Sequence, residues 1–284
     1  MDHSKILIVG ANGQLGRALK QSYPNAKAYT SSELDITNMP SLSKIDWKEV
    51  DIIINAAAYT NVDNSETVDG RKLAWKVNAE GTRNLVSIAL RNDLLVVGIS
   101  TDYVFDGTIK SHLETENFSP INVYGQSKAA GDIVYSLLTN YYIIRTSWVI
   151  GDGKNFVKTM IDLGKRNIQP KVIADQIGRL TFTDELVKAI NHLLITKPDS
   201  GIYNVSNSGP ISSWADITRQ IFKLCKYSLN VIDTSSSAYF KDKPMSAKRP
   251  LYSVLDLTKI HSTGFNSTNW LIDLKTYINK EGLN

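Results

Sequence analysis

The sequence has little cysteine and no long apolar segment. Cys225 is the single cysteine among 284 residues, so no intrachain disulfide can form and a disulfide-stabilised secreted scaffold is excluded. The first apolar segment, Ile6–Val9, is far too short for a signal sequence or a membrane span. We therefore expect a cytoplasmic protein with no membrane partner.

Charge of either sign is also modest. The chain has 32 Lys and Arg against 28 Asp and Glu, which leaves a net charge of +4. Basic residues form no consecutive block, so a nucleic acid is not an expected partner. Hydrophobic residues make up 42% of the chain and charged residues 21%, values typical of globular proteins, which excludes a disordered or fibrous chain.

Short apolar segments rich in Val and Ile alternate with longer amphipathic segments. The apolar segments, which we predict to be strands, are Lys5–Val9, Ala26–Thr30, Asp51–Asn55, Leu94–Ser100, Tyr141–Thr146, Lys171–Ile173 and Ile202–Val205. The predicted helices are Leu15–Ser22, Arg71–Arg91, Tyr124–Leu138, Asp184–Leu194 and Trp214–Cys225. The early strands are nearly continuous in apolar residues, as expected for strands buried on both faces of a parallel sheet.

This alternation predicts an α/β fold with a doubly wound, Rossmann-type parallel sheet. The pattern becomes less regular beyond about Gly151. We therefore predict a first domain over residues 1–150, joined by returning segments near 181–205. A smaller C-terminal substrate-binding domain is expected mainly over residues 151–284.

A glycine-rich segment follows the first predicted strand and opens the first predicted helix. Glycines there let the backbone turn tightly and approach a pyrophosphate, and a helix N-terminus offers free N–H groups to the anion. The position between a strand and a helix is the context that such a motif requires. We predict that the first domain binds a dinucleotide through Gly10, Asn12, Gly13, Gln14, Leu15 and Gly16.

The end of the second predicted strand bears on the choice of cofactor. It reads Thr30-Ser31-Ser32, without an acidic residue to bond a ribose 2′-hydroxyl, so a 2′-phosphate is not repelled there. Arg17, beside the last glycine, is within reach of such a phosphate. These features favour NADPH, with NADH as the alternative.

Three side chains form a predicted catalytic group. Tyr124 and Lys128 are four residues apart on a predicted helix and so share one face. A nearby ammonium lowers the pKa of a phenol from its usual value near 10, so Tyr124 is predicted to act as general acid for a carbonyl. Lys128 would tune it and bond the nicotinamide ribose. Thr101, at the end of a predicted strand, would polarise the substrate oxygen.

Longer segments resemble a known family. The spacing G-x-x-G-x-x-G is typical of extended short-chain dehydrogenase/reductases. The segments that resemble dTDP-4-dehydrorhamnose reductases in particular are 55–63 (NAAAYTNVD), 100–107 (STDYVFDG), 120–128 (PINVYGQSK), 145–149 (RTSWV), 155–160 (NFVKTM), 174–178 (ADQIG) and 249–253 (RPLYS). The resemblance spans nearly the whole chain.

The resemblance implies NADPH-dependent reduction of the C4 ketone of dTDP-4-dehydro-L-rhamnose to dTDP-L-rhamnose. A dTDP-sugar is then the substrate, which Thr101, Asp102 and Trp148 would contact. The positions implied to contact the cofactor, besides the glycine segment and Arg17, are Asp35, Ile36, Ala57, Ala58, Tyr59, Thr60, Tyr124 and Lys128.

The sequence departs from the family pattern in two places. Some members bind Mg²⁺ at a dimer interface through an acidic residue two positions after the last glycine, where this chain has Ala18. The resemblance therefore predicts no metal ligand here and leaves a homodimer open. Residues 179–181 read Arg-Leu-Thr where the family often has Pro-Thr, a difference that bears on the sugar accepted.

Two alternatives stay open. The first is a related sugar-nucleotide epimerase or dehydratase that retains NAD, although Tyr103 stands where a dehydratase would carry a second carboxylate. The second is a non-catalytic regulatory subunit of the same fold. The joint presence of Thr101, Tyr124 and Lys128 argues against it.

Overall fold

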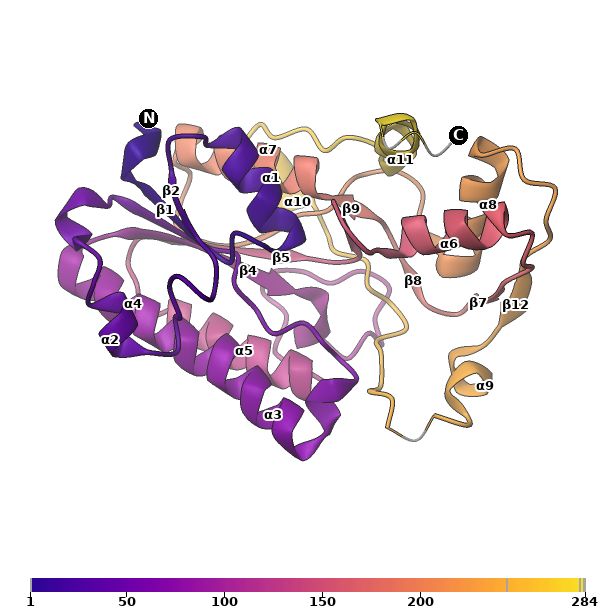
Figure 1. The fold of residues 1–284 in the computed structure, drawn as a ribbon, viewed down its shortest axis with the longest axis horizontal. Helices are drawn as coiled ribbons and strands as arrows, with labels where there is room; N and C mark the ends of the chain where they lie inside the picture. Colours follow the sequence, from indigo (N-terminus) through magenta and orange to yellow (C-terminus); the bar gives the residue numbers. More distant parts are fainter. Residues whose placement is uncertain (1, 244, 281, 283–284) are drawn as a thin grey trace.

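The computed structural model describes residues 2–243, 245–280 and 282. A six-stranded parallel sheet forms its centre, which confirms the predicted doubly wound α/β fold (Figure 1). From one edge to the other the strands are β10 (Gly201–Asn204), β5 (Tyr141–Thr146), β4 (Leu95–Thr101), β3 (Ile52–Asn55), β1 (Ile6–Val9) and β2 (Lys27–Tyr29). The order reverses between β1 and β3, and open α/β sheets bind ligands at the carboxyl ends of the strands beside such a reversal.

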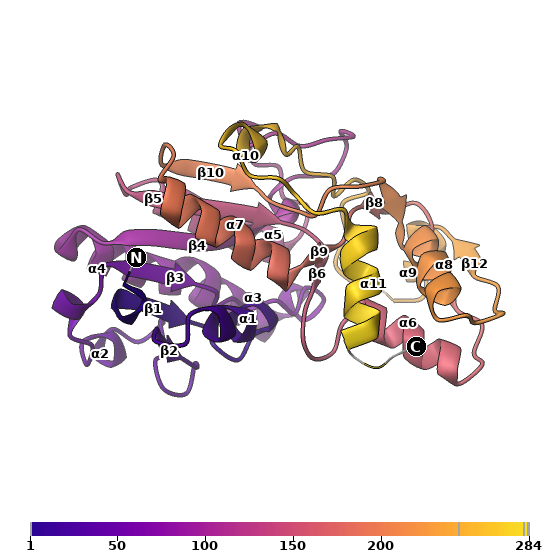
Figure 2. The same ribbon diagram turned by 90° about the horizontal axis from the view of Figure 1, so that it is seen from above.

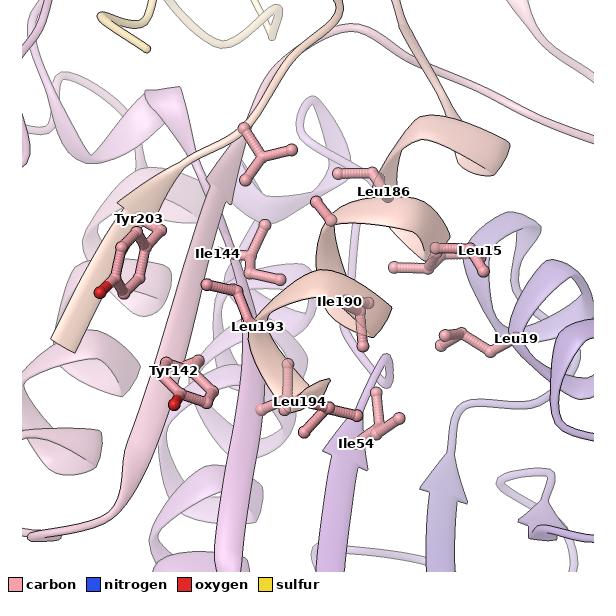
Figure 3. Packing of buried hydrophobic residues seen from close by; sticks show 14 of the residues in the cluster. Leu15, Leu19, Ile54, Tyr142, Ile144, Leu186, Ile190, Leu193, Leu194 and Tyr203 are labelled. Carbon is pink, nitrogen blue, oxygen red and sulfur yellow. The ribbon is translucent and has the colours of Figure 1, made fainter. Parts of the chain in front are cut away.

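One face of this sheet is covered by α1 (Gln14–Ser22), α7 (Thr183–Thr196) and α10 (Thr258–Ser262). Figure 3 shows leucines of α1 and α7, among them Leu19 and Leu193, packed over Ile54 and Ile144 of the sheet. Burial of such a side chain stabilises the fold by about 1.5–3 kcal/mol. Although α7 and β10 come late in the sequence, they belong to this first core.

The other face is covered by α2 (Met39–Leu42), α4 (Thr82–Asn92) and α5 (Val123–Tyr135), with α3 (Val68–Trp75) beside α5 (Figure 1). Gly98 of β4 lets α5 approach closely, because a Cβ atom there would lie 2.4 Å from the Tyr135 ring. The Tyr135 hydroxyl in turn accepts a hydrogen bond from Asn55 Nδ2 at 2.7 Å. These contacts fix α5 against the strand ends that carry the predicted site.

The predicted helix over residues 71–91 is interrupted. A π-helical segment, η4 (Lys76–Gly81), separates α3 from α4, and α3 begins earlier than expected because the Thr67 side chain accepts a hydrogen bond from Gly70 N–H. Gly81 lies against Ile36, where a Cβ atom would be 2.7 Å from the Ile36 side chain. Single π-helical turns inside helices are frequent at functional sites.

The C-terminal part forms a smaller lobe beside the sheet (Figure 2). It has its own core, in which α6 (Phe156–Lys165), α8 (Trp214–Leu224) and α11 (Trp270–Lys280) pack around Trp270. Its other elements are β7 (Lys171–Ile173), β8 (Ile177–Gly178), β11 (Ser212–Ser213), β12 (Ile232–Thr234) and α9 (Ser236–Phe240). The short pair β6 (Val149–Ile150) and β9 (Thr181–Phe182) connects this lobe to the sheet.

The remaining elements are short 3₁₀ turns. They are η1 (His3–Lys5), η2 (Trp47–Glu49), η3 (Asn64–Glu66) and η5 (Asp102–Val104). Within the described ranges, none of the helices is long and apolar enough to span a bilayer.

Candidate active site

The glycine-rich segment forms a cradle at the carboxyl end of β1. Gly10 has φ +81°, and a Cβ atom there would lie 2.5 Å from the backbone nitrogen of Ala57. A Cβ atom at Gly16 would lie 2.0 Å from the Gly10 carbonyl oxygen. Gly13 is the N-cap of α1 and supplies no side-chain cap. The cradle therefore has the bare backbone and the helix N-terminus that bind a pyrophosphate.

A cavity of about 440 Å³ extends from this cradle along the carboxyl ends of the strands. Eleven of the residues predicted from the sequence line it: Gly13, Gln14, Leu15, Ala57, Ala58, Thr60, Thr101, Asp102, Tyr124, Lys128 and Trp148. The predicted cofactor, proton-donor and sugar contacts thus share one space. A larger cavity, of about 600 Å³, lies near Pro198 and contains none of them. We place the site by this shared set of residues, not by cavity size.

Tyr124 and Thr101 are joined by a side-chain hydrogen bond. Burial raises the pKa of the Tyr124 phenol above its usual value, and the bond with Thr101 lowers it in part. Lys128 has no resolved effect on this pKa, contrary to the tuning expected from the sequence. The phenol is therefore protonated at neutral pH, the state that a proton donor requires.

Lys128 lies on the same face of α5 and is 6% exposed. Its Nζ donates a hydrogen bond to the Ile99 carbonyl oxygen at 2.6 Å. Burial lowers the pKa of the ammonium, and the negative charge of Asp132 raises it. One donor direction of Lys128 is thus fixed by β4, while the side chain borders the cavity.

Asp102 is buried beside Thr101, whose Oγ1 donates to Asp102 Oδ1 at 3.1 Å. The Ser253 side chain also interacts with this carboxylate, and Asp102 Oδ2 itself has no hydrogen-bond partner among the residues that the structure describes. Burial raises the pKa of this carboxyl to about 6. A buried acceptor without a partner that borders the cavity suits a ligand hydroxyl.

Trp148 adopts φ +47°, a left-handed conformation that is uncommon for a large side chain. Its ring stacks on that of Trp214, with centroids 3.7 Å apart and planes inclined by 18°. A Cβ atom at Gly178 would lie 2.9 Å from the Trp148 indole, so only glycine leaves room for this ring. Trp214 also lines the cavity, and no motif in the sequence indicates it.

Asn78 is a second residue that sequence reasoning missed. It lies in the π-helical segment, where its Oδ1 accepts from Tyr59 N–H at 2.8 Å and its Nδ2 donates to Ser127 Oγ at 2.9 Å. Asn78 therefore joins the loop after β3 to the helix that carries Tyr124 and Lys128. The Tyr59 ring itself is not among the lining residues of the cavity.

Arg17 lies outside the cavity lining and contacts Asp152 and the Asn12 carbonyl oxygen. Its Nε is 3.1 Å from Asp152 Oδ2. A separate recess at the end of β2 is bordered by Arg17 together with Lys20, Thr30 and Glu33. Glu33 Oε2 accepts from Thr30 N–H at 2.8 Å, so an acidic side chain reaches this strand end after all.

Two predicted cofactor residues have other partners. Asp35 Oδ1 accepts from the Thr37 backbone N–H at 2.9 Å and from its hydroxyl at 2.8 Å. Ile36 is buried in the core, and its carbonyl oxygen accepts from Asn84 Nδ2. Neither lines the cavity, and their predicted contact with adenine stays a prediction. Among the described residues, no cluster of three or more His, Cys, Asp or Glu could hold a metal ion.

Comparisons with known proteins agree with this geometry. The dTDP-4-dehydrorhamnose reductase of Aggregatibacter actinomycetemcomitans is 38% identical, over 96% of this chain and 97% of that protein. A crystal structure of dTDP-4-dehydrorhamnose reductase from Bacillus anthracis in complex with NADP superposes with a TM-score of 0.88. It is 37% identical, over 97% of this chain and 98% of its own.

A second solved structure, of a dTDP-4-dehydrorhamnose reductase from Clostridium acetobutylicum, gives a TM-score of 0.89. It is 38% identical, over 98% of this chain and 99% of its own. The family model described as "RmlD substrate binding domain" matches residues 4–282. The chain therefore belongs to the family of dTDP-4-dehydrorhamnose reductases that this model describes.

Proposed function

We propose that the chain reduces the C4 ketone of dTDP-4-dehydro-L-rhamnose with NADPH and releases dTDP-L-rhamnose. The observation that carries this proposal is the single cavity in which the Tyr124–Thr101 hydrogen bond, Lys128 and the glycine cradle meet. Support comes also from the relatives named for this reaction. A cytoplasmic location and a dTDP-sugar substrate belong to the same proposal.

The chain's own groups fit the cofactor that we propose. The glycine cradle and the start of α1 would hold the pyrophosphate, and a side chain at Gly10 or Gly16 would fill that space. Ala57, Ala58 and Thr60 would border the dinucleotide, and Lys128 would bond the nicotinamide ribose. When bound, the reduced nicotinamide supplies a hydride for the ketone carbon.

Tyr124 would supply the proton. In the reduction, the ketone oxygen gains negative charge as its carbon is reduced, and the Tyr124 hydroxyl donates its proton to that oxygen. The Thr101 hydroxyl is bonded to Tyr124 in the protein and would help to hold the same oxygen. Asp102 Oδ2 would accept a sugar hydroxyl, and the Trp148 ring would cover the apolar face of the deoxysugar.

An isomeric ketosugar is the second candidate substrate. A relative from Streptomyces niveus, named dTDP-4-keto-6-deoxy-D-glucose reductase, is 34% identical over 77% of this chain. The same Tyr124 and Thr101 would serve both ketones, so the sugar pocket decides between them. A dehydratase is less favoured, because Tyr103 is a partly buried phenol, whose pKa burial raises, and it offers no second carboxylate.

The test supplies each ketosugar in turn to the purified chain. Both dTDP-4-dehydro-L-rhamnose and dTDP-4-keto-6-deoxy-D-glucose are offered with NADPH or NADH, absorbance at 340 nm is followed, and the product is identified by NMR. We expect NADPH oxidation and dTDP-L-rhamnose from the first substrate. Tyr124→Phe should lower kcat by about 100-fold or more while NADPH binding is retained. No turnover of either sugar by the folded wild type would refute the proposal.

A further inference from the structure

The catalytic face of α5 continues one turn beyond Lys128 to a second charged residue. Asp132 follows Lys128 at the i+4 position and is 2% exposed. Its Oδ2 lies 3.1 Å from Nε of Arg145 on β5, and Arg145 is 1% exposed. A buried ion pair is costly to form, because both charges lose their hydration. The position of this costly ion pair directly behind the site therefore indicates a functional role for it.

Arg145 is held rigidly on the far side of this pair. Its Nη1 donates to the Glu114 carbonyl oxygen at 3.1 Å. Its guanidinium carbon lies 5.1 Å from the ring centroids of both Phe105 and Phe118. A planar cation between two aromatic rings with a backbone acceptor has little freedom to turn. The Asp132 carboxylate is thus anchored from β5 and the loop over residues 105–118.

The neighbouring strand β4 anchors Lys128. Its Ser100 lies opposite Arg145 in the backbone register, and Ile99, the residue before Ser100, provides the carbonyl oxygen that accepts from Lys128 Nζ. Lys128 and Asp132 act on each other electrostatically. Burial on its own would favour the neutral amine at Lys128, and a neutral amine would withdraw the positive charge from beside Tyr124.

We propose that Asp132, held by Arg145, is a positioning residue that keeps the buried Lys128 ammonium charged at the border of the cavity. The proposal rests on the proposed reductase function, since it assigns Lys128 its part there. Asp132 touches neither substrate nor cofactor in this scheme and acts through Lys128. Burial raises the pKa of Asp132, and the Arg145 and Lys128 charges lower it, so the Arg145 side chain favours the ionised carboxylate that this role needs.

The direction of the expected pH effect follows from the charges around Lys128. These are Asp132 on the same helix, with Arg145 of β5 paired to it, Asp102 at the end of β4 and the titratable phenol of Tyr124. Of these groups Asp132 alone has a resolved effect on the Lys128 pKa, so loss of its charge leaves burial, which favours neutral lysine. It also removes a negative charge that raises the pKa of Tyr124. Both effects shift the alkaline limb of kcat to lower pH.

The direct test measures Lys128 itself in the full-length protein. Lysine side chains are labelled with ¹³C, the Lys128 signal is assigned with Lys128→Met, and its titration is followed by NMR. In Asp132→Asn we expect the Lys128 midpoint to fall by about one unit or more and the alkaline limb of kcat to follow it. Asp132→Glu, which keeps the charge, should restore both. An unchanged Lys128 midpoint in folded Asp132→Asn would overturn the proposal.

Two further variants separate this role from a structural one. Glu185→Gln removes another buried carboxylate, on α7 outside the cavity lining, and should leave the Lys128 midpoint unchanged. If Asp132→Asn does not fold, Asp132→Leu with Arg145→Met removes both charges together, a change that buried pairs tolerate better. The double variant should again lower the midpoint, and a wild-type midpoint there would refute the role. Because the NMR titration needs no ketosugar, its outcome is independent of the proposed substrate.

Discussion

Trp148 and Trp214 stack face to face with their ring centroids 3.7 Å apart, although one follows β5 and the other begins α8 of the smaller lobe. Phe156 packs on the far side of the pair, 4.3 Å from the Trp214 ring. The two indoles therefore border the cavity from both parts of the molecule.

Replacement of Trp214 should weaken substrate binding more than chemistry. In Trp214→Ala the Trp148 ring loses its stacking partner and moves more freely, so we expect KM for the ketosugar to rise about tenfold while kcat changes little. Such a stacking contact contributes about 0.5–1.5 kcal/mol. Trp75→Ala, at a 41% exposed position on α3, serves as the control and should leave KM unchanged. A fall in kcat alone would contradict this assignment.

Substitutions in the glycine cradle should have graded effects on NADPH binding. Gly16→Ala places a Cβ atom 2.0 Å from the Gly10 carbonyl oxygen, whereas in Gly13→Ala the nearest atom is 3.3 Å away. We expect Gly16→Ala to abolish measurable NADPH binding and to lower Tm, and Gly13→Ala to weaken binding only several-fold. Fluorescence titration with NADPH and thermal unfolding measure both effects. Equal affinities in the two variants would argue against a backbone cradle.

Asp102→Asn should stabilise the protein without ligand at alkaline pH. Burial raises the pKa of Asp102 from 3.8 to about 6, so the folded state disfavours the charged carboxyl. The contribution of the neutral Asp102 carboxyl to the free energy of unfolding is fully present below pH 3.8 and is lost as the pH rises through 6. We expect the variant to exceed the wild type in unfolding free energy at pH 8 by up to about 3 kcal/mol.

The unfolding free energies of Asp102→Asn and the wild type, compared at lower pH, test whether the Asp102 charge is the cause of the difference. Below pH 3.8 the wild-type carboxyl is protonated in both the folded and the unfolded state, so the difference in unfolding free energy between the two proteins should largely vanish there and be about halved at pH 5. Urea unfolding at pH 4, pH 5 and pH 8 measures it. A stability gap that does not change with pH would show that the Asp102 charge is not responsible.

Arg17 should set the preference for NADPH, because its guanidinium can bind either the 2′-phosphate of NADPH or the Asp152 carboxylate. Arg17→Ala removes a cation beside the recess at the end of β2, so KM for NADPH should rise about tenfold with little change for NADH. Asp152→Asn frees Arg17 from its ion pair and should lower KM for NADPH. Arg166→Ala, which removes an exposed arginine paired with Asp162, is the control. Equal changes for both cofactors in Arg17→Ala would exclude this role.

The sheet and the central site could be predicted because their signals are local. Continuous apolar segments mark the buried strands, the i, i+4 spacing of Tyr124 and Lys128 puts both on one helix face, and Thr101 follows a strand directly. The glycine spacing marks the cradle at the start of α1 in the same way. Each of these features is encoded within a few consecutive residues.

What could not be predicted depends on contacts between distant segments. Trp214 meets Trp148 across the two lobes, and Asn78 reaches the catalytic helix from a π-helical turn that helical periodicity does not reveal. Glu33 was overlooked because the chain turns after Thr30 and brings the carboxylate back to the strand end. The spacing predicted that Lys128 lowers the Tyr124 pKa, but burial of the phenol raises this pKa, and Lys128 has no resolved effect on it.

The position of Trp148 has an evolutionary consequence. Its indole occupies the space that any side chain at Gly178 would need, so neither position can change alone without a clash or a void. A smaller residue in place of Trp148 would leave room for a side chain at position 178, whereas the indole leaves room for glycine alone. Paired variation at these two positions would then mark lineages in which this end of the cavity has been reshaped.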